Sequence, residues 1–308
     1  LPATVPFVGP ETQERSRGGA FRARIGANEN VFGPSPAVAD AIAQAASGAW
    51  MYGDPENHVL RHAVAEHHGV APDNVMTGEG IDGLLGYVVR MLVESGDRVV
   101  TSTGAYPTFN YHVVGYDGSL VTVPYREDCE DVEALLEAAA AQQAKLIYLA
   151  NPDNPMGTWW GAEVINEMIA RVPEGTLLLL DEAYGEFAEP DTLPEIDVSS
   201  DSVLRFRTFS KAYGLAGIRV GYVIGESALV GEFNKVRNHF GVGRVAQAAA
   251  LAALEDQDHL ALVLDQVKRA RVRITGIALE NGLVSLASAT NFVTIDCGRD
   301  GDFAVAVL

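Results

Sequence analysis

The sequence predicts an α/β fold with a mostly parallel central sheet flanked by helices. Short apolar or β-rich segments recur between residues 98 and 224, and amphipathic helical patterns separate them. Segments that are apolar along their whole length are typical of strands buried on both faces. Strands that alternate with helices favour a parallel sheet.

The expected strands are short and end in polar, glycine or proline residues. They lie at 98–102, 120–124, 145–150, 176–181, 203–208 and 219–224. Helical patterns at 131–142 and 162–171 lie between them. A helical pattern at 81–94 precedes the first of these strands and places Leu84, Leu85, Val88, Met91 and Leu92 on one side. We therefore expect one large domain over residues 28–245.

The sequence changes character near residue 246. An Ala/Leu-rich helix at 246–255 is followed by a long charged amphipathic helix at 258–281, which ends at Gly282. Residues 289–296 are expected to form a strand, and a new helical pattern begins after it. These features predict a smaller α+β domain over 246–308 that continues beyond Leu308, and an irregular arm over 1–27.

Composition excludes several classes of function. The chain has 308 residues with 22 basic and 41 acidic side chains, so its net charge is 22 − 41 = −19. Such a surface repels nucleic-acid phosphates and anionic lipids, so neither is an expected partner. The two cysteines, Cys129 and Cys297, fit no metal spacing and indicate a reducing cytoplasm. We expect no metal site, signal peptide or membrane span.

A lysine in the segment F-S-K-A-Y-G-L-A-G-I-R-V-G-Y (209–222) carries the strongest functional signal. Thr208 and Ser210 flank Lys211, and Arg219 follows eight residues later. An amine forms a Schiff base with an aldehyde, whereas hydroxyls, backbone N–H groups and an arginine hold a phosphate. A cofactor that carries both groups is pyridoxal phosphate. A surface lysine in an ordinary loop is the alternative.

Polar residues follow two other strands. Asp181 and Tyr184 lie where T-L-L-L-L-D-E-A-Y leaves a buried strand, and ligands of open α/β sheets bind at such carboxyl ends. A buried acid needs a partner, and a protonated pyridine nitrogen supplies one. Tyr184, and Asn154 in the turn N-P-D-N-P-M-G (151–157), are candidates to bond the ring's phenolate oxygen. A capping aspartate and a plain turn are the alternatives.

The segment G-E-G-I-D-G (78–83) follows a strand-like V-M-T and precedes a helix. It matches the dinucleotide fingerprint, so a nicotinamide dehydrogenase is an alternative. No strand with an acid follows at the expected spacing, so we interpret Gly80, Ile81 and Asp82 as N–H donors to one phosphate. Tyr106, in G-A-Y after the strand 98–102, is either a ring-stacking residue or a core tyrosine.

Taken in order, these motifs resemble the fold-type I pyridoxal-phosphate aminotransferases, and among them the histidinol-phosphate aminotransferase group. The resemblance covers residues 27–222. It is carried by A-N-E-N (27–30), F-G-P-S-P (32–36), Y-G-D-P-E (52–56), G-E-G-I-D, G-A-Y, N-P-D-N-P-M-G, D-E-A-Y and T-F-S-K-A-Y-G-L-A-G-I-R-V-G-Y.

The resemblance implies a role for each matching residue. Lys211, Asp181 and Tyr184 would be catalytic: the Schiff-base lysine and proton shuttle, the partner of the pyridine nitrogen, and a ligand of the phenolate oxygen. Asn154 would share that oxygen and Tyr106 would stack on the ring. The phosphate would be held by Ile81, Asp82, Thr208, Ser210 and Arg219, with Gly80 beside them. Tyr52 would reach the cofactor of a neighbouring subunit, which implies a homodimer with shared active sites.

The resemblance also leaves the substrate open. Asn28, Glu29 and Phe7 are the candidate substrate contacts, and Phe7 stands where histidinol-phosphate enzymes have a tyrosine that contacts the substrate phosphate. The expected reaction moves an amino group between histidinol phosphate or an aromatic amino acid and 2-oxoglutarate. The alternatives are a decarboxylase of the same fold that acts on a phosphorylated threonine, a cofactor-sensing regulator and a dehydrogenase.

Overall fold

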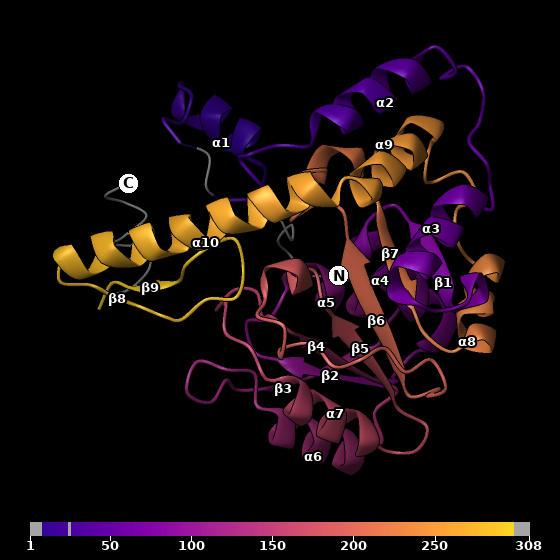
Figure 1. Cartoon of the computed structure of the whole chain (residues 1–308). Helices are drawn as coiled ribbons and strands as arrows, with labels where there is room; N and C mark the ends of the chain where they lie inside the picture. The colour runs from indigo at the N-terminus through magenta and orange to yellow at the C-terminus, as the bar shows by residue number, and fades with distance from the viewer. Residues whose placement is uncertain (1–7, 24–25, 299–308) are drawn as a thin grey trace.

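A seven-stranded sheet forms the centre of the computed structural model, which describes residues 8–23 and 26–298 (Figure 1). In chain order its strands are β1 (Val75–Gly78), β2 (Arg98–Ser102), β3 (Ser119–Val123), β4 (Leu146–Ala150), β5 (Leu177–Asp181), β6 (Val203–Thr208) and β7 (Gly221–Ile224). In space the order is β1-β7-β6-β5-β4-β2-β3. The α/β fold and all six strands expected between residues 98 and 224 are confirmed.

Strands β2 to β6 run parallel, whereas β7 is antiparallel to both of its neighbours. The reversal brings the start of β7 beside the ends of β6 and β1, because Gly221 pairs with both Thr208 and Gly78. The Lys211 segment links β6 to β7 and therefore lies at the same edge as Asp181, the last residue of β5. This edge gathers the predicted functional residues.

Helices cover both faces of the sheet. They are α1 (Pro10–Arg17), α2 (Pro36–Ala46), α3 (His58–His68), α4 (Ile81–Leu92), α5 (Pro107–Gly115), α6 (Val132–Gln142), α7 (Ala162–Ala170), α8 (Ser227–Glu232), α9 (Arg244–Glu255) and α10 (Gln257–Glu280). One core joins α4 and α5 to Tyr148 of β4 and Leu179 of β5. A second core joins α6 and α7 to Ile147 and Leu149. Successive residues of β4 therefore enter opposite cores, as expected in a pleated strand.

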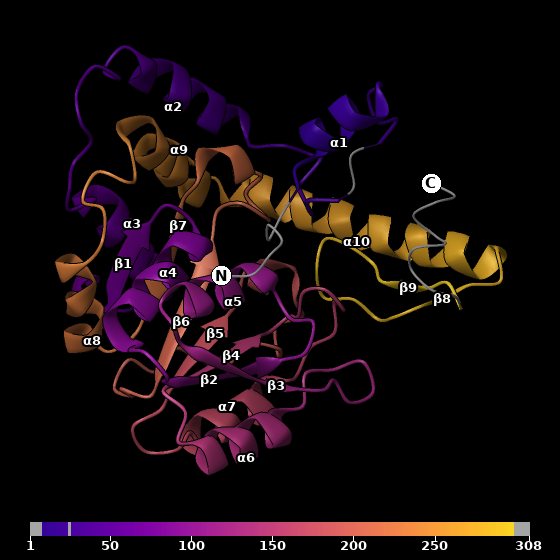
Figure 2. The same ribbon diagram turned by 180° about the vertical axis from the view of Figure 1, so that it is seen from behind.

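A third core lies beside β7 and contains residues from distant parts of the chain. Val38 of α2 and Val64 of α3 pack with Ala250 of α9 and Val263 of α10. The far half of α10 extends away from the sheet and carries the small hairpin of β8 (Val284–Ser285) and β9 (Ile295–Asp296) (Figures 1 and 2). The domain boundary expected near residue 246 stays a prediction.

Two local predictions are wrong. The arm is not irregular throughout, because α1 begins with Pro10 at its first turn and ends at Gly18, whose left-handed φ of 74° stops the helix. The strand expected at 289–296 is reduced to β9. Ser288 and Thr290 use their hydroxyls to bond the Phe292 carbonyl, at 2.5 and 3.1 Å, and these local bonds compete with strand pairing. Within the described ranges, no helix is both long and apolar enough to cross a bilayer.

Candidate active site

Lys211 lies half-buried just beyond the carboxyl end of β6. Its Nζ donates to the carbonyl oxygens of Ala27 and Asn28, both at 3.3 Å, and lies 5.4 Å from the centre of the Tyr184 ring. Burial lowers the pKa of Lys211 to about 8, although the charge of Asp181 acts in the opposite direction. This shift leaves a larger fraction of the amine neutral at physiological pH than in an ordinary lysine, and the neutral amine is the nucleophilic, proton-accepting form.

Asp181 is buried at the end of β5 and is held by two neutral donors. The Tyr148 hydroxyl donates to Oδ2 at 2.7 Å, and the N–H of Ala183 donates to Oδ1 at 2.9 Å. Burial raises the pKa of Asp181 to about 6, although both hydrogen bonds lower it. Neither of these two donors carries a charge, so a cationic ligand can still pair with the carboxylate.

The start of α4 and the guanidinium of Arg219 form an anion-binding corner. Ile81 and Asp82 begin the helix, where N–H groups have no partner within the helix. A side chain on Gly80 would place its Cβ 2.4 Å from an Arg219 nitrogen, so the absence of one lets the guanidinium approach the backbone. Arg219 also donates to the Ser210 hydroxyl at 3.3 Å. Helix N-termini and arginines both favour phosphate.

Thr208 and Ser210 join this corner to Lys211. The Thr208 hydroxyl donates to the Val220 carbonyl at 3.3 Å and accepts from the Ser210 N–H at 3.0 Å. Both residues are buried where β6 leaves the sheet. These bonds fix the turn that carries the lysine, so its amine and the anion corner keep a defined separation.

Aromatic and amide side chains follow the ends of neighbouring strands: Tyr106 follows β2, Asn154 follows β4 and Tyr184 follows β5. Burial raises the pKa of Tyr106, the charges of Asp82 and Asp181 raise it further, and that of Arg219 lowers it. The Tyr184 hydroxyl accepts from Asn28 Nδ2 at 3.3 Å. Asn154 is half-buried in the loop after β4, the strand that pairs with β5.

The structure does not bring every predicted residue together. Tyr52 is 77% exposed and packs against Phe240 with ring centres 4.6 Å apart. Glu29 is exposed next to Asn28, yet its charge raises the pKa of Lys211. Phe7 lies outside the described residues, so its predicted contact with substrate stays a prediction.

Sequence reasoning missed two groups of residues around the site. One is Tyr148, the donor to Asp181; the signal was a tyrosine inside the otherwise apolar strand K-L-I-Y-L-A. The other is a pair of buried acids, Glu130 and Asp153, of which Asp153 directly precedes Asn154 in the loop after β4. Its signal was weaker, because Glu130 lies in an acidic loop that reads as solvent-exposed.

Comparison with known proteins identifies the chain. Residues 24–302 match the family described as aminotransferase class I and II. The chain belongs to this family. A histidinol-phosphate aminotransferase from Sinorhizobium meliloti, solved in complex with pyridoxal-5′-phosphate, is 55% identical, with a TM-score of 0.96 over 98% of this chain and 83% of that one.

Curated relatives agree with the structural match. Histidinol-phosphate aminotransferase 2 of Caulobacter vibrioides is 37% identical over 92% of this chain and 75% of its own length. Histidinol-phosphate aminotransferase 1 of Mesorhizobium japonicum is 33% identical over 93% and 80%. The resemblance to fold-type I aminotransferases of the histidinol-phosphate type is thus confirmed, and the enzyme depends on pyridoxal 5′-phosphate.

The residues present fit this cofactor. The half-buried amine of Lys211 suits an aldehyde, and the corner of Gly80 and Arg219 suits a phosphate. The buried carboxylate of Asp181, which accepts from two neutral donors, suits a protonated ring nitrogen. The same corner explains the dinucleotide-like glycines, since a helix N-terminus with a nearby arginine serves a single phosphate equally well.

Proposed function

We propose that this aminotransferase takes the amino group of histidinol phosphate and transfers it to 2-oxoglutarate. The donor is supported by the relatives, which include proteins named histidinol-phosphate aminotransferase at 33 to 55% identity. The acceptor is the one that the sequence resemblance implies. A family of enzymes that run two half-reactions on one site needs both a donor amine and a keto acid.

The residues of the site divide the work between them. Bound pyridoxal phosphate supplies an aldehyde that bonds amines and a ring that accepts electrons. Lys211 would hold the aldehyde and would move the substrate α-proton, first as base and then as acid. Asp181 keeps the ring nitrogen protonated, and Tyr184 with Asn154 orients the ring oxygen. Ile81, Asp82, Thr208, Ser210 and Arg219 hold the phosphate while Tyr106 covers the ring.

The observation that carries the proposal is the position of the Lys211 amine at the ends of the strands, where it donates to the carbonyl oxygens of Ala27 and Asn28 and where burial lowers its pKa to about 8. We expect Lys211→Ala to lose catalytic turnover and the visible absorbance of lysine-bound cofactor. Lys268→Ala is the matched control, because Lys268 pairs with Glu189 on the exposed surface at 3.2 Å. Sustained multiple turnover by Lys211→Ala would refute the assignment.

The donor is tested by a screen at fixed 2-oxoglutarate. We expect kcat/KM for histidinol phosphate to exceed that for histidinol, phenylalanine, tyrosine and threonine phosphate. A higher value for phenylalanine or tyrosine would assign the enzyme to aromatic amino acids, the donors that Phe7 suggests. Release of carbon dioxide from threonine phosphate without use of the keto acid would indicate the decarboxylase instead.

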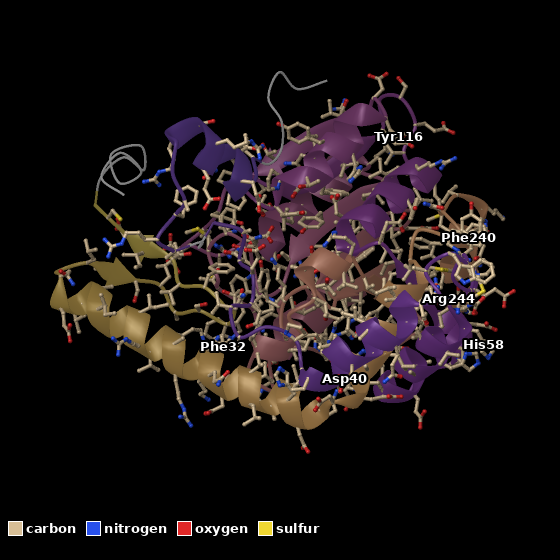
Figure 3. All side chains as sticks on the ribbon, turned by 90° about the horizontal axis from the view of Figure 1, so that it is seen from above. Phe32, Asp40, His58, Tyr116, Phe240 and Arg244 are labelled. Carbon is tan, nitrogen blue, oxygen red and sulfur yellow. The ribbon has the colours of Figure 1, made fainter. Side chains whose placement is uncertain are left out.

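We also propose a cytoplasmic homodimer in which Tyr52 serves the neighbouring subunit's site. Tyr52 is 77% exposed and lies beside Phe240 and Arg244 at one edge of the molecule (Figure 3), and Trp50, two residues earlier, is 82% exposed. Exposed aromatic residues are typical of interfaces. Mixed dimers of Tyr52→Phe and Lys211→Ala contain one intact site, so we expect about half of the native activity per dimer. Inactive mixed dimers would exclude a shared site.

A further inference from the structure

We propose that Tyr148 is a positioning residue for the reaction: its hydroxyl keeps the Asp181 carboxylate ionised and turned toward the cofactor ring. The proposal rests on the pairing of Asp181 with the ring nitrogen described above. It assigns a role to a residue of β4 that belongs to none of the motifs of the sequence. The evidence is the strand register, the hydrogen bonds of the acid and the packing around the tyrosine.

The strand register places Tyr148 within reach of Asp181. In the parallel pair of β4 and β5, Tyr148 lies opposite Leu179, and Ala150 lies opposite Asp181. Residues two apart on a strand point to the same face, so Tyr148, Leu179 and Asp181 all face α4 and α5. Diagonal neighbours on one face lie roughly 7–8 Å apart, which a long side chain spans.

The hydrogen bonds fix both carboxylate oxygens. Oδ2 accepts from the Tyr148 hydroxyl at 2.7 Å, and Oδ1 accepts from the Ala183 N–H at 2.9 Å. Each oxygen keeps a second lone pair for another donor. Two donors, one on each oxygen, hold the carboxylate in one orientation and leave a lone pair on each oxygen for the cofactor.

Packing holds the tyrosine itself in place. Its side chain is fully buried, and its ring stacks on Phe109 of α5 with centres 4.8 Å apart and planes 19° apart. Burial and the neighbouring charge of Asp181 raise the pKa of Tyr148 well above its ordinary value. The phenol therefore stays protonated at every working pH and acts only as the donor.

A buried tyrosine with a purely structural role would also need a partner for its hydroxyl, so the hydrogen bond alone does not show a role in the reaction. The effect of Tyr148 on the ionisation of Asp181 distinguishes the two roles. A hydrogen bond to a carboxylate lowers the pKa of the acid. Burial raises the pKa of Asp181, and the hydrogen bond from Tyr148 is the largest effect that lowers it. Without it, more of the acid is protonated. A neutral acid cannot hold the ring nitrogen in its protonated form, which is the form that withdraws electrons.

The experiment compares Tyr148→Phe with Tyr222→Phe in the holoenzyme. Tyr222 is an equally buried strand tyrosine, and its hydroxyl is bonded to His68 of α3 at 2.9 Å. We expect Tyr148→Phe to lower kcat roughly 10- to 100-fold, because hydrogen bonds to charged groups are worth about 1.5–3 kcal/mol, while KM changes little. The acidic midpoint of kcat should rise by about one to two pH units. Tyr222→Phe should leave both quantities at the native values.

Two outcomes overturn the proposal, and a third variant shows which assumption failed. If Tyr148→Phe shares the kcat and pH profile of Tyr222→Phe, Tyr148 has only a structural role. If its kcat falls without a shift of the acidic midpoint, the hydroxyl does not control the ionisation of Asp181. Asp181→Asn tests the underlying assumption that Asp181 acts on the cofactor. Native activity in that variant would refute the role of Asp181 itself. Loss of activity in Asp181→Asn together with native activity in Tyr148→Phe would refute only the role of Tyr148.

Discussion

Asp181 and Glu182 are adjacent and both buried, but Asp181 has neutral hydrogen-bond donors whereas Glu182 pairs with two arginines. Asp181 faces the site and is held by a hydroxyl and a backbone N–H. Glu182 faces the other side of the sheet edge, where Arg205 approaches to 2.6 Å and Arg207 to 2.9 Å. Burial alone would raise the pKa of Glu182, but Arg207 and Arg205 outweigh it and hold that pKa below its ordinary value.

The difference shows which acid is available for function. The charge of Glu182 is neutralised inside the protein, and Arg205 also donates to the carbonyls of Pro194 and Glu195, so the network is satisfied without a ligand. Asp181 keeps a charge that only an incoming cation matches closely. A buried acid with neutral partners at a strand end is thus a better indicator of a binding site than a buried ion pair.

The largest expected effect comes from breaking the closed network. Glu182→Gln leaves Arg205 and Arg207 buried without their carboxylate, and removal of one partner from a buried pair costs about 3–5 kcal/mol. We expect a lower free energy of unfolding for the cofactor-free protein, measured by denaturant titration. A loss of stability below that range would mean that Glu186, 3.6 Å from Arg207, takes over as its partner.

Asp181→Asn should show the converse behaviour. The amide keeps the hydrogen bond from Tyr148 but no longer carries charge, so the cofactor-free protein should be as stable as the native one or more so. The kcat should fall on the order of 10²–10³-fold, as when a preorganised electrostatic group is lost. Steady-state kinetics and denaturation of both variants test this crossover. Equal stability losses in the two variants would contradict it.

The sequence predicted this edge because its signals are local. Strands end where apolar runs meet Asp181, Thr208 and Asn151, and each end is visible within a few residues. The partners of these residues come from register and topology, which short motifs do not encode. Tyr148 reaches Asp181 only because β4 and β5 pair without a stagger. The strand expected at 289–296 failed for the opposite reason, since local hydroxyl bonds outweighed its β-rich composition.

Glu130 is a third buried acid, and it differs from Asp181 and Glu182 because it is expected to stay protonated near neutral pH. It accepts from the Ser102 hydroxyl at 2.5 Å and from the Ala150 N–H at 2.9 Å, close to the buried Asp153. Burial and then the charge of Asp153 raise the pKa of Glu130 to about 8. Because the folded pKa exceeds the ordinary value of 4.5, the stability that Glu130 contributes is fully present below pH 4.5 and is lost as pH rises through about 8.

We therefore expect the contribution of Glu130 to stability to fall between pH 4.5 and 8, with a slope of up to about 1.4 kcal/mol per pH unit. Burial also shifts the pKa values of Asp153, to about 6, and Lys211, to about 8, so the contribution of Glu130 is the difference between the native and Glu130→Gln profiles. Glu130→Gln stays neutral and should flatten the profile. Denaturant titrations of both proteins at four pH values measure the effect, and parallel profiles would contradict the assignment.

The smallest effect is expected from the same chemistry at the surface. Arg171 of α7 bonds both oxygens of Glu133 on α6, at 2.5 and 2.7 Å, a geometry as close as that of Glu182 with Arg205. Both side chains are largely exposed, so water and salt screen the pair. Glu133→Gln should lower Tm slightly in dilute buffer and not at all in molar salt, whereas the loss in Glu182→Gln should persist in both. A loss of stability in Glu133→Gln that survives molar salt would show that burial does not set the strength of these ion pairs.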